Sequence, residues 1–266
     1  MRAASGKTTD RDFLQREFEA LGVHQGMIVM VHSSLSAFGR VEGGAQTVVG
    51  ALRRCVGESG TIVVPAYTGQ VADPCPRSRE FDDPEVTAAR RGVPVFHDAL
   101  PTAMGAIPNA VLADPDRLRS SHPQASVAAL GAGAREITGH QPLAYALGTG
   151  SPFEKMYELG GHILLLGVGH NRNSFLHHAE SLIPNHRKKL RRFPYLVERQ
   201  RLWVEAVDVG DDNDTYFPRI GEEFGESGLI RSRTIGSARC LLMESVPFID
   251  YAKVRLEELL AEAASR

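Results

Sequence analysis

Short apolar runs alternate with segments of helical periodicity along this chain, and this alternation constrains the fold more than any other feature. Met27–Val31 is an apolar run with β-branched residues, followed by a polar loop and a helical pattern over residues 45–55. Thr61–Val64 then has the pattern of a second buried strand. A strand, a helix and a second strand in succession form a βαβ unit, whose two strands lie parallel in one sheet. The chain is therefore predicted to have an α/β fold.

A second joint between a strand and a helix lies further along the chain. Ile163–Val168 is the most apolar strand candidate, and it leads through Gly169 into a helical segment at Asn171–Ile183. The 266 residues contain no internal repeat or low-complexity linker, so one domain over residues 1–266 is expected. We predict three α/β/α layers around a central mixed, largely parallel sheet, and we leave open a small carboxy-terminal lobe.

Charge and cysteine content exclude several classes of partner. Lys and Arg number 30 and Asp and Glu number 32, a net charge of −2, so neither nucleic acid nor an anionic membrane is expected as a partner. Cys55, Cys75 and Cys240 lack CxxC spacing, which is typical of reduced thiols rather than of a disulfide framework. No apolar run approaches the length of a membrane helix. We therefore predict a cytoplasmic protein.

The densest group of reactive side chains follows the most apolar strand. The chain lacks GxGxxG, GxxxxGKS/T, GxSxG and HExxH, so the usual signatures of dinucleotide folds, P-loop enzymes, serine hydrolases and thermolysin-like enzymes are absent. Residues 170–180 instead hold His170, His177, His178 and Glu180. Because ligands bind outside the carboxyl ends of strands in open α/β sheets, these side chains are predicted to face a crevice.

Two members of this group form a candidate acid–base pair. If Asn173 or Ser174 caps the helix, His177 and Glu180 share one helical face, because they are three residues apart. A carboxylate on that face holds the imidazole in one orientation and stabilises its protonated form. Such a pair is suited to take a proton from an amine or a hydroxyl nucleophile. The alternative is a solvated helix pair without a catalytic role.

The same group of residues also offers metal-ligand atoms. His177 and His178 are adjacent on a helix and point about 100° apart, so they are poorly placed to share one ion. A metal site would need a further histidine from elsewhere in the chain. We expect no metal, and we keep a metal site as a minor alternative.

Four other stretches are candidates for binding an anion. The loop His32–Gly44 is rich in serine and glycine, so backbone N–H groups and the following helix N-terminus can approach a pyrophosphate. Pro101–Gly105 and Arg119–Gly131 add polar donors, although caps and turns around short elements explain these residues equally well. The basic run Arg187–Arg192 is either a solvated face or a partner for a phosphorylated cofactor.

Taken together, these stretches resemble the aminoglycoside 3-N-acetyltransferase family, antibiotic acetyltransferases that are unrelated in sequence to the GNAT superfamily. The resemblance spans nearly the whole chain, and blocks in the same order are more specific than any single motif. The blocks are His32-Ser33-Ser34-Leu35 with Phe38-Gly39 and Gly43-Gly44, Gly60-Thr61 with Pro65, Pro101-Thr102 with Met104-Gly105, Arg119-Ser120 with His122-Pro123 and Ser126–Ala129, Ser151-Pro152, Leu164–Gly167, and Leu176-His177 with Ala179-Glu180.

The resemblance implies direct transfer of an acetyl group from acetyl-coenzyme A to an amine, typically the 3-amino group of an aminoglycoside, which confers resistance. His177 would take the proton of the amine, and Glu180 would orient the ring. Donors for the developing oxyanion are expected from backbone N–H groups of Ser33–Leu35 or from the Ser174 hydroxyl. The residues expected to bind the cofactor are His32, Ser33, Ser34, Leu35, Thr102, Met104, Gly105, Arg119, Ser120 and Ser126.

An aminoglycoside acceptor is a polycation, so carboxylates are expected to bind it. They are sought in the irregular segment Tyr67–Pro101, and acidic residues at 211–214 could add to them. A basic region for the cofactor and an acidic region for the acceptor, at two ends of one cleft, would together produce the net charge of −2. The residues expected to bind the acceptor are Tyr67, Asp73, Glu80, Asp82 and Asp83.

Three alternatives to this function stay open at the level of sequence. The enzyme could acetylate an amine other than an aminoglycoside, for example a biosynthetic intermediate. It could instead be a metal-dependent hydrolase that uses His177, His178 and Glu180. Finally, the chain could bind coenzyme A or a nucleotide without turning it over. The sequence makes no prediction of the oligomeric state.

Overall fold

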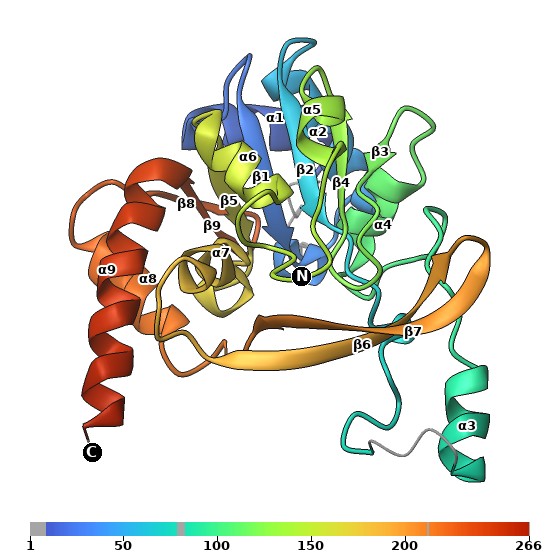
Figure 1. The fold of residues 1–266 in the computed structure, drawn as a ribbon. Helices are drawn as coiled ribbons and strands as arrows, with labels where there is room; N and C mark the ends of the chain where they lie inside the picture. Colours follow the sequence, from blue (N-terminus) through green and yellow to red (C-terminus); the bar gives the residue numbers. More distant parts are fainter. Residues whose placement is uncertain (1–8, 79–82, 212, 266) are drawn as a thin grey trace, which may run out of the picture.

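The computed structural model of the chain describes residues 9–78, 83–211 and 213–265. Its centre is a seven-stranded sheet in the order β3-β4-β2-β1-β5-β9-β8, shown in Figure 1. A separate two-stranded hairpin pairs β6 with β7. The strands are β1 (Ile28–Ser33), β2 (Thr61–Pro65), β3 (Leu118–Arg119), β4 (Val127–Gly131), β5 (His162–Leu166), β6 (Lys188–Val197), β7 (Gln200–Val209), β8 (Arg231–Ile235) and β9 (Ala238–Glu244).

Five of the seven strands of the central sheet point in the same direction. β1 is parallel to both β2 and β5. β4 and β9 are antiparallel to β2 and β5, and β3 and β8 reverse the direction once more. The predicted mixed, largely parallel sheet is therefore confirmed, with β4 and β9 as the two reversed strands.

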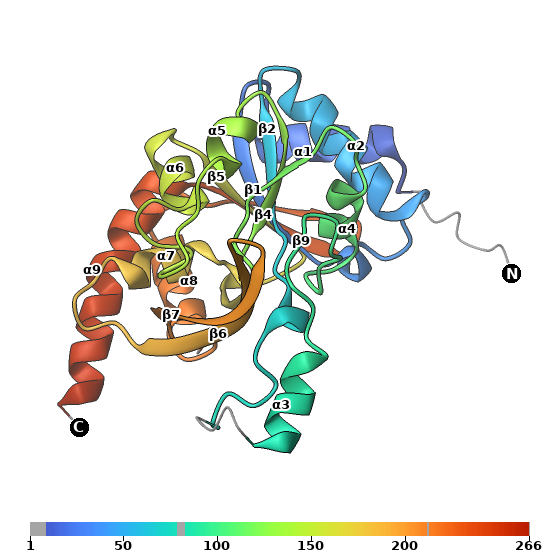
Figure 2. The same cartoon turned by 45° about the vertical axis from the view of Figure 1, so that its right-hand side comes forward.

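Helices cover both faces of the central sheet (Figures 1 and 2). Alternate residues of each strand enter opposite cores, as the period of two in a strand requires. Val29 and Val31 of β1 pack on one face with helices α1, α2 and α4, whereas Met30 packs on the other with α5 to α9. The helices are α1 (Arg11–Leu21), α2 (Gly44–Val56), α3 (Pro84–Arg91), α4 (Ala106–Leu112), α5 (Ala134–Thr138), α6 (Pro152–Glu158), α7 (Phe175–Ser181), α8 (Phe217–Gly225) and α9 (Ser245–Ala264).

Short 3₁₀ helices stand at the joints between strands and helices. They are η1 (Leu35–Phe38), η2 (Gly69–Val71) and η3 (His170–Arg172). The segment predicted as one helix over Asn171–Ile183 is in fact η3 followed by α7. Asn173 has an extended conformation and separates the two. None of the helices in the described ranges is long and apolar enough to cross a membrane.

The carboxy-terminal residues complete the central sheet. β9 pairs with β5, and β8 pairs with β9, while α9 buries Phe248, Ile249 and Leu256 against the same core. A small carboxy-terminal lobe is therefore not formed within the described residues. The element that stands apart from the central sheet is the β6–β7 hairpin, which lies beneath the sheet in Figure 1.

The hairpin contains the basic run that the sequence suggested for a cofactor. Arg187 stands just before β6, and residues 188–192 form the first half of that strand. The irregular segment before α4 packs against the hairpin, since Asp73 N–H donates to Arg192 O at 3.0 Å. Its helix α3 is held there too, because Arg201 donates to the carbonyls of Arg90 and Val93, both at 2.9 Å.

Candidate active site

The two strand-to-helix joints predicted from the sequence meet at one edge of the sheet. β1 and β5 are parallel and adjacent, with Ser33 in register with Leu166. Ser34 N–H donates to Leu166 O at 2.9 Å, which ties the two following loops together. Gly167 has φ +68°, and a Cβ atom there would lie 2.3 Å from the Cβ of Ala37. Only glycine allows this close approach of η1 to the end of β5.

A contact between β1 and α7 positions the start of the histidine-bearing helix. Ser174 N–H donates to Nε2 of His32 at 3.0 Å. Asn173 Oδ1 accepts the N–H of Phe175 at 3.2 Å, so Asn173 supplies the side-chain cap that Ser174 does not. Burial lowers the pKa of His32 to about 3. The ring is therefore neutral, and because Nε2 accepts a hydrogen bond, its proton is on Nδ1.

His177 and Glu180 lie together on α7, as their spacing predicts. Nδ1 of His177 is 3.2 Å from Oε2 of Glu180, and the other carboxylate oxygen accepts a hydrogen bond from Nε of Arg187 at 2.9 Å. Glu180 is fully buried, whereas His177 keeps 13% of its side chain exposed. The ring of His177 also meets Phe217 edge to face, with 4.8 Å between centroids. The imidazole is thus fixed from two sides.

His177 opens into a cavity of about 260 Å³ between α7, the hairpin and the loop after β2. The cavity combines an aromatic hydroxyl, carboxylates and amides, a lining suited to a polar ligand with several amino and hydroxyl groups. Burial raises the pKa of Tyr67 above its ordinary value, so its phenol is protonated. The lining residues are Tyr67, Gln124, Ala125, Leu147, His177, Arg191, Asp208, Val209, Asp211 and Asn213.

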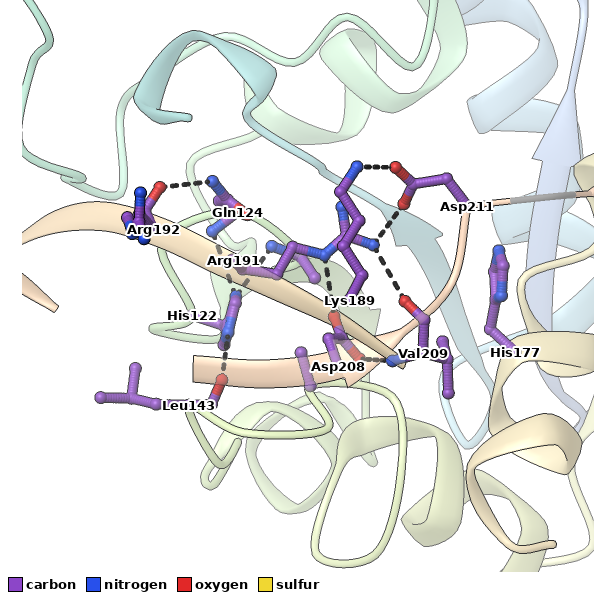
Figure 3. A network of polar contacts seen from close by, with 12 residues as sticks. His122, Gln124, Leu143, His177, Lys189, Arg191, Arg192, Asp208, Val209 and Asp211 are labelled. Carbon is purple, nitrogen blue, oxygen red and sulfur yellow. Dashed lines mark hydrogen bonds and ion pairs between the residues drawn. The ribbon is translucent and has the colours of Figure 1, made fainter. Parts of the chain in front are cut away.

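Carboxylates and cations alternate along the hairpin side of this cavity (Figure 3). Arg191 bridges two acids, with Nε 3.4 Å from Oδ2 of Asp208 and Nη2 2.5 Å from Oδ1 of Asp211. Lys189 pairs with the other oxygen of Asp211. Burial raises the pKa of Asp208, and its contacts with Arg191 and with the N–H of Val209 oppose that rise.

His122 supports the opposite wall of the cavity and is not part of a catalytic pair. Its Nδ1 accepts the N–H groups of Gln124 and Ala125, at 3.1 and 2.9 Å. Its Nε2 lies 3.2 Å from Leu143 O, to which it donates (Figure 3). Burial lowers the pKa of His122 to about 4. The ring is therefore neutral, and it orients the backbone on which Gln124 lines the cavity.

A second cavity, of about 340 Å³, lies beside the loop over residues 32–44, which is rich in serine and glycine and is called the serine loop below. Its walls are mainly apolar, from Val31, Pro65, Met104, Pro108 and Val168, with Arg172 as the cation. Two buried polar atoms of the described residues face no protein partner here, Nδ1 of His32 and Oγ of Ser33. Because buried donors are nearly always satisfied, these two atoms are available to a ligand.

The serine loop also borders a more open cavity of about 610 Å³. Ser33 and Ser34 line both this cavity and the previous one. Leu35, Arg40, Gly105 and the start of α2 complete the open one. Of the residues predicted to bind a cofactor, the structure brings together His32, Ser33, Ser34, Leu35, Met104 and Gly105 around these two cavities.

The other predicted cofactor residues have partners within the protein in this structure, and their part in cofactor binding stays a prediction. Arg119 donates to the carbonyls of Ala66, Asp98 and Leu100 and to the hydroxyl of Ser126. Ser126 in turn donates to Ala66 O. Four of the five N–H groups of the Arg119 guanidinium are thus used within the protein.

Ser120 and Thr102 are likewise used within the protein. The hydroxyl of Ser120 donates to Oε1 of Gln141 at 2.6 Å, and that of Thr102 donates to Tyr67 O at 2.6 Å. Thr102 Oγ1 also accepts the N–H of Met104 at 3.1 Å. Both residues are therefore structural, and Thr102 holds Tyr67 and Met104, which line the two cavities.

Among the residues predicted to bind the acceptor, Tyr67 lines the cavity of His177. Asp73 does not, because its carboxylate is 2% exposed and bound by Arg90 at 2.8 and 3.0 Å. Asp83 caps α3 by accepting the N–H groups of Glu85 and Val86. Glu80 and Asp82 lie outside the described residues. Asp73 and Asp83 thus have partners within the protein, and the acidic rim over Asp73, Glu80, Asp82 and Asp83 stays a prediction.

The sequence prediction missed Asp208, Gln124 and Arg172. One signal was present for Asp208, an acid between Val207 and Val209 at the end of an alternating strand. An acid at that position faces either solvent or, if it is buried, a partner. Gln124 belongs to a loop and Arg172 to the short helix η3, so no periodicity predicts the direction of their side chains.

The geometry does not support the hypothesis that His177, His178 and Glu180 bind a metal ion. His178 is buried, and its Nδ1 lies 2.7 Å from Leu147 O, so it points away from His177. Across the ranges that the structure describes, no group of three or more His, Cys, Asp or Glu side chains is arranged to hold a metal ion. Nδ1 of His178 is thus used within the protein, whereas His177 and Glu180 contact each other.

Comparison with known proteins identifies the family. Residues 30–257 match the family described as aminoglycoside 3-N-acetyltransferase. Aminoglycoside N(3)-acetyltransferase VII of Streptomyces paromomycinus is 34% identical over an alignment that covers 98% of this chain and 95% of that protein. A match of this extent, on a shared fold, defines the chain as an N-acetyltransferase enzyme. The chain belongs to the aminoglycoside 3-N-acetyltransferase family.

Two solved structures carry ligands of that chemistry. The aminoglycoside acetyltransferase AAC-IIIb, in a binary complex with CoASH, has a TM-score of 0.83 and 32% identity over 95% of this chain and 97% of that one. AAC-VIa bound to sisomicin has a TM-score of 0.84 and 27% identity over 95% of this chain and 98% of that one. The fold and the family implied by the sequence are confirmed.

Proposed function

We propose that this enzyme transfers the acetyl group of acetyl-coenzyme A directly to an amino group of an aminoglycoside, typically the 3-amino group, and thereby confers resistance. The observation that carries the proposal is the contact of His177 with the buried Glu180, because the ring of His177 opens into a polar cavity between α7 and the hairpin. The family and the two ligand-bound neighbours support this choice of substrates.

His177 is proposed as the general base. In this proposal Nδ1 of His177 donates to Oε2 of Glu180, and Nε2 is then left free for a proton. An aminoglycoside amine is mostly protonated at neutral pH and cannot attack a thioester until it loses that proton. His177 takes it, and the carboxylate of Glu180 stabilises the imidazolium that forms. The proton then leaves to solvent.

Coenzyme A is proposed to bind along the serine loop, and the residues there fit it. The coenzyme, when bound, supplies the acetyl group as a thioester. The apolar cavity matches a pantetheine arm, and the buried donors on His32 Nδ1 and Ser33 match its amide carbonyls. Arg172 and Arg40 are the cations at the two cavities and would face its phosphates.

Donors for the oxyanion are proposed from the same edge of the sheet. Ser34 N–H is not among them, since it is bound to Leu166 O. Of the other candidates suggested by the sequence, Leu35 N–H, at the start of η1, and the Ser174 hydroxyl are proposed. No acyl-enzyme is required: Cys55 and Cys240 are buried thiols, and burial raises the pKa of both to about 12.

Thiol release tests the proposal. The protein is incubated with acetyl-coenzyme A and a panel of aminoglycosides that includes sisomicin, and free coenzyme A is followed with a thiol reagent. We expect release that depends on the acceptor, with the product acetylated on one amino group, located by mass spectrometry and NMR. Absence of release with every amine, by protein shown to be folded, would overturn the proposed function.

A further inference from the structure

Among the described residues, those that line the cavity of His177 and their ion-pair partners carry no excess negative charge, although a polycationic acceptor requires one. Asp208 and Asp211 line it, but Arg191 touches both acids and Lys189 pairs with Asp211. The negative charges of the two acids are therefore balanced by the positive charges of Arg191 and Lys189. An ammonium group entering the cavity must compete with a cation that is already present.

The two acids are held unequally. Asp211 is half exposed and is bound by Arg191 at 2.5 Å as well as by Lys189. Asp208 is 8% exposed, and its partners are its neighbouring Val209 N–H at 2.9 Å and Arg191 Nε at 3.4 Å. A contact of 3.4 Å is long for a charge-assisted hydrogen bond. Asp208 is thus a desolvated carboxylate with little compensation, which favours a better-placed cation.

Arg191 is also placed to move. Its side chain is 25% exposed and lines the cavity instead of being enclosed by it. Its third contact, with Val209 O, is 3.4 Å long. Arg192, the next residue, has its side chain 7% exposed and faces Glu205 and Asp73 on the other side of the strand. Of the two, only Arg191 stands at the cavity.

We propose that Asp208 and Asp211 form the ammonium subsite of the acceptor, and that Arg191 is an internal cation which occupies this subsite until an acceptor amine displaces it. The inference rests on the proposed function, because it takes the acceptor to be a polyamine. Asp208 lines the same cavity as His177, so an ammonium held by Asp208 places the amine beside the base. Arg191 then determines specificity, since a weakly cationic ligand cannot displace it.

Substitution of Arg191 tests the exchange. Arg191→Gln removes the charge while keeping much of the length, and Lys188→Gln is the matched control, because it removes one charge from an exposed position on the same strand. Sisomicin binding is measured by calorimetry at pH 8 and low salt. Arg191→Gln is expected to bind sisomicin about tenfold more tightly than wild type, the change of one charge contact. Its affinity is also expected to fall more steeply with added salt.

The substitution of Asp208 is tested both in the wild-type protein and in the Arg191→Gln variant. Asp208→Asn is expected to weaken sisomicin binding, and the gain from Arg191→Gln is expected to vanish in the double variant, because the two residues act on one subsite. Unchanged or weaker binding by folded Arg191→Gln, relative to Lys188→Gln, would overturn the inference. An equal gain in the presence and absence of Asp208 would do so too.

A measurement on the wild-type protein covers the case in which Arg191→Gln does not fold. The ¹⁵N signal of the Arg191 side-chain Nε–H, assigned with Arg191→Lys, is expected to shift and to exchange faster with water when sisomicin is added. An unchanged signal at saturating sisomicin would refute displacement. Failure of the proposed function is recognised separately, as absence of thiol release by wild-type protein with every acceptor.

Discussion

Oε2 of Glu180 lies 3.2 Å from Nδ1 of His177, while its Oε1 lies 2.9 Å from Nε of Arg187. The carboxylate is fully buried and thus joins the helix that bears the base to the residue that precedes the hairpin. His177 on α7 and Arg187 just before β6 thus both contact the carboxylate of Glu180. Glu180 therefore fixes the ring of His177 and also fixes the position of the hairpin relative to α7.

Replacement of Glu180 by glutamine separates orientation from charge. Glu180→Gln keeps the volume and one acceptor oxygen but loses the charge that stabilises the imidazolium. We expect turnover to fall by about tenfold to a hundredfold, less than on loss of His177 itself. Steady-state thiol release measures this, and thermal unfolding shows that the variant is folded. Wild-type turnover in Glu180→Gln would argue that the carboxylate is structural only.

Asp73 is predicted to contribute to stability and not to acceptor binding. Asp73→Ala leaves the buried guanidinium of Arg90 without its carboxylate, and removal of one partner of a buried pair costs about 3 to 5 kcal/mol. Asp83→Ala is the control from the same segment, because loss of an N-cap costs about 1 kcal/mol. Urea unfolding measures both changes.

The KM for the acceptor distinguishes the two roles of Asp73. Measured at a temperature at which Asp73→Ala is folded, it is expected to equal that of Asp83→Ala. A raised KM with unchanged stability would restore Asp73 as an acceptor ligand.

Buried neutral histidines make the stability depend on pH. Burial lowers the pKa of His122 to about 4, against an ordinary value of about 6.5. The unfolded chain therefore binds more protons between these values, so stability is complete above about pH 6.5 and is lost as the pH falls toward 4. His122 should contribute a loss of about 2 kcal/mol between pH 7 and pH 5.

Urea unfolding of wild type, His122→Gln and His140→Gln at pH 7 and pH 5 checks this effect. His140 is exposed, so its substitution should leave the pH dependence as in wild type, whereas His122→Gln should reduce it. His32 and His170, whose pKa values burial lowers to about 3 and about 4, add to the loss in wild type. Equal unfolding free energies at the two pH values in wild type would contradict the account.

Periodicity in the sequence was enough to predict the central sheet and the contact of His177 with Glu180. The apolar runs at residues 27–31, 61–64 and 163–168 became β1, β2 and β5, because a buried parallel strand must be apolar on both faces. His177 and Glu180 were found because helical spacing by itself places them on one face. The start of α7 lies beside β1 because β1 and β5 end at a common edge, where Ser174 N–H donates to Nε2 of His32.

Residues whose partners come from distant loops could not be predicted in this way. Arg119 and Asp73 have the chemistry of ligand-binding residues, but tertiary packing gives them carbonyls and Arg90 as partners. Asp208 and Arg191 are brought to His177 by the fold of the hairpin against α7, and no local pattern encodes that contact. Long-range pairing of polar side chains decides these roles.

The central claim is that His177, oriented by Glu180, takes the proton from the acceptor amine. The most direct test is thiol release from acetyl-coenzyme A with sisomicin, by wild-type protein, His177→Ala and the control His140→Ala, with coenzyme A binding followed by calorimetry. His177→Ala is expected to retain coenzyme A binding and to lose about 10² to 10⁴ in turnover, while His140→Ala turns over as wild type. Near-normal turnover by His177→Ala would contradict the account.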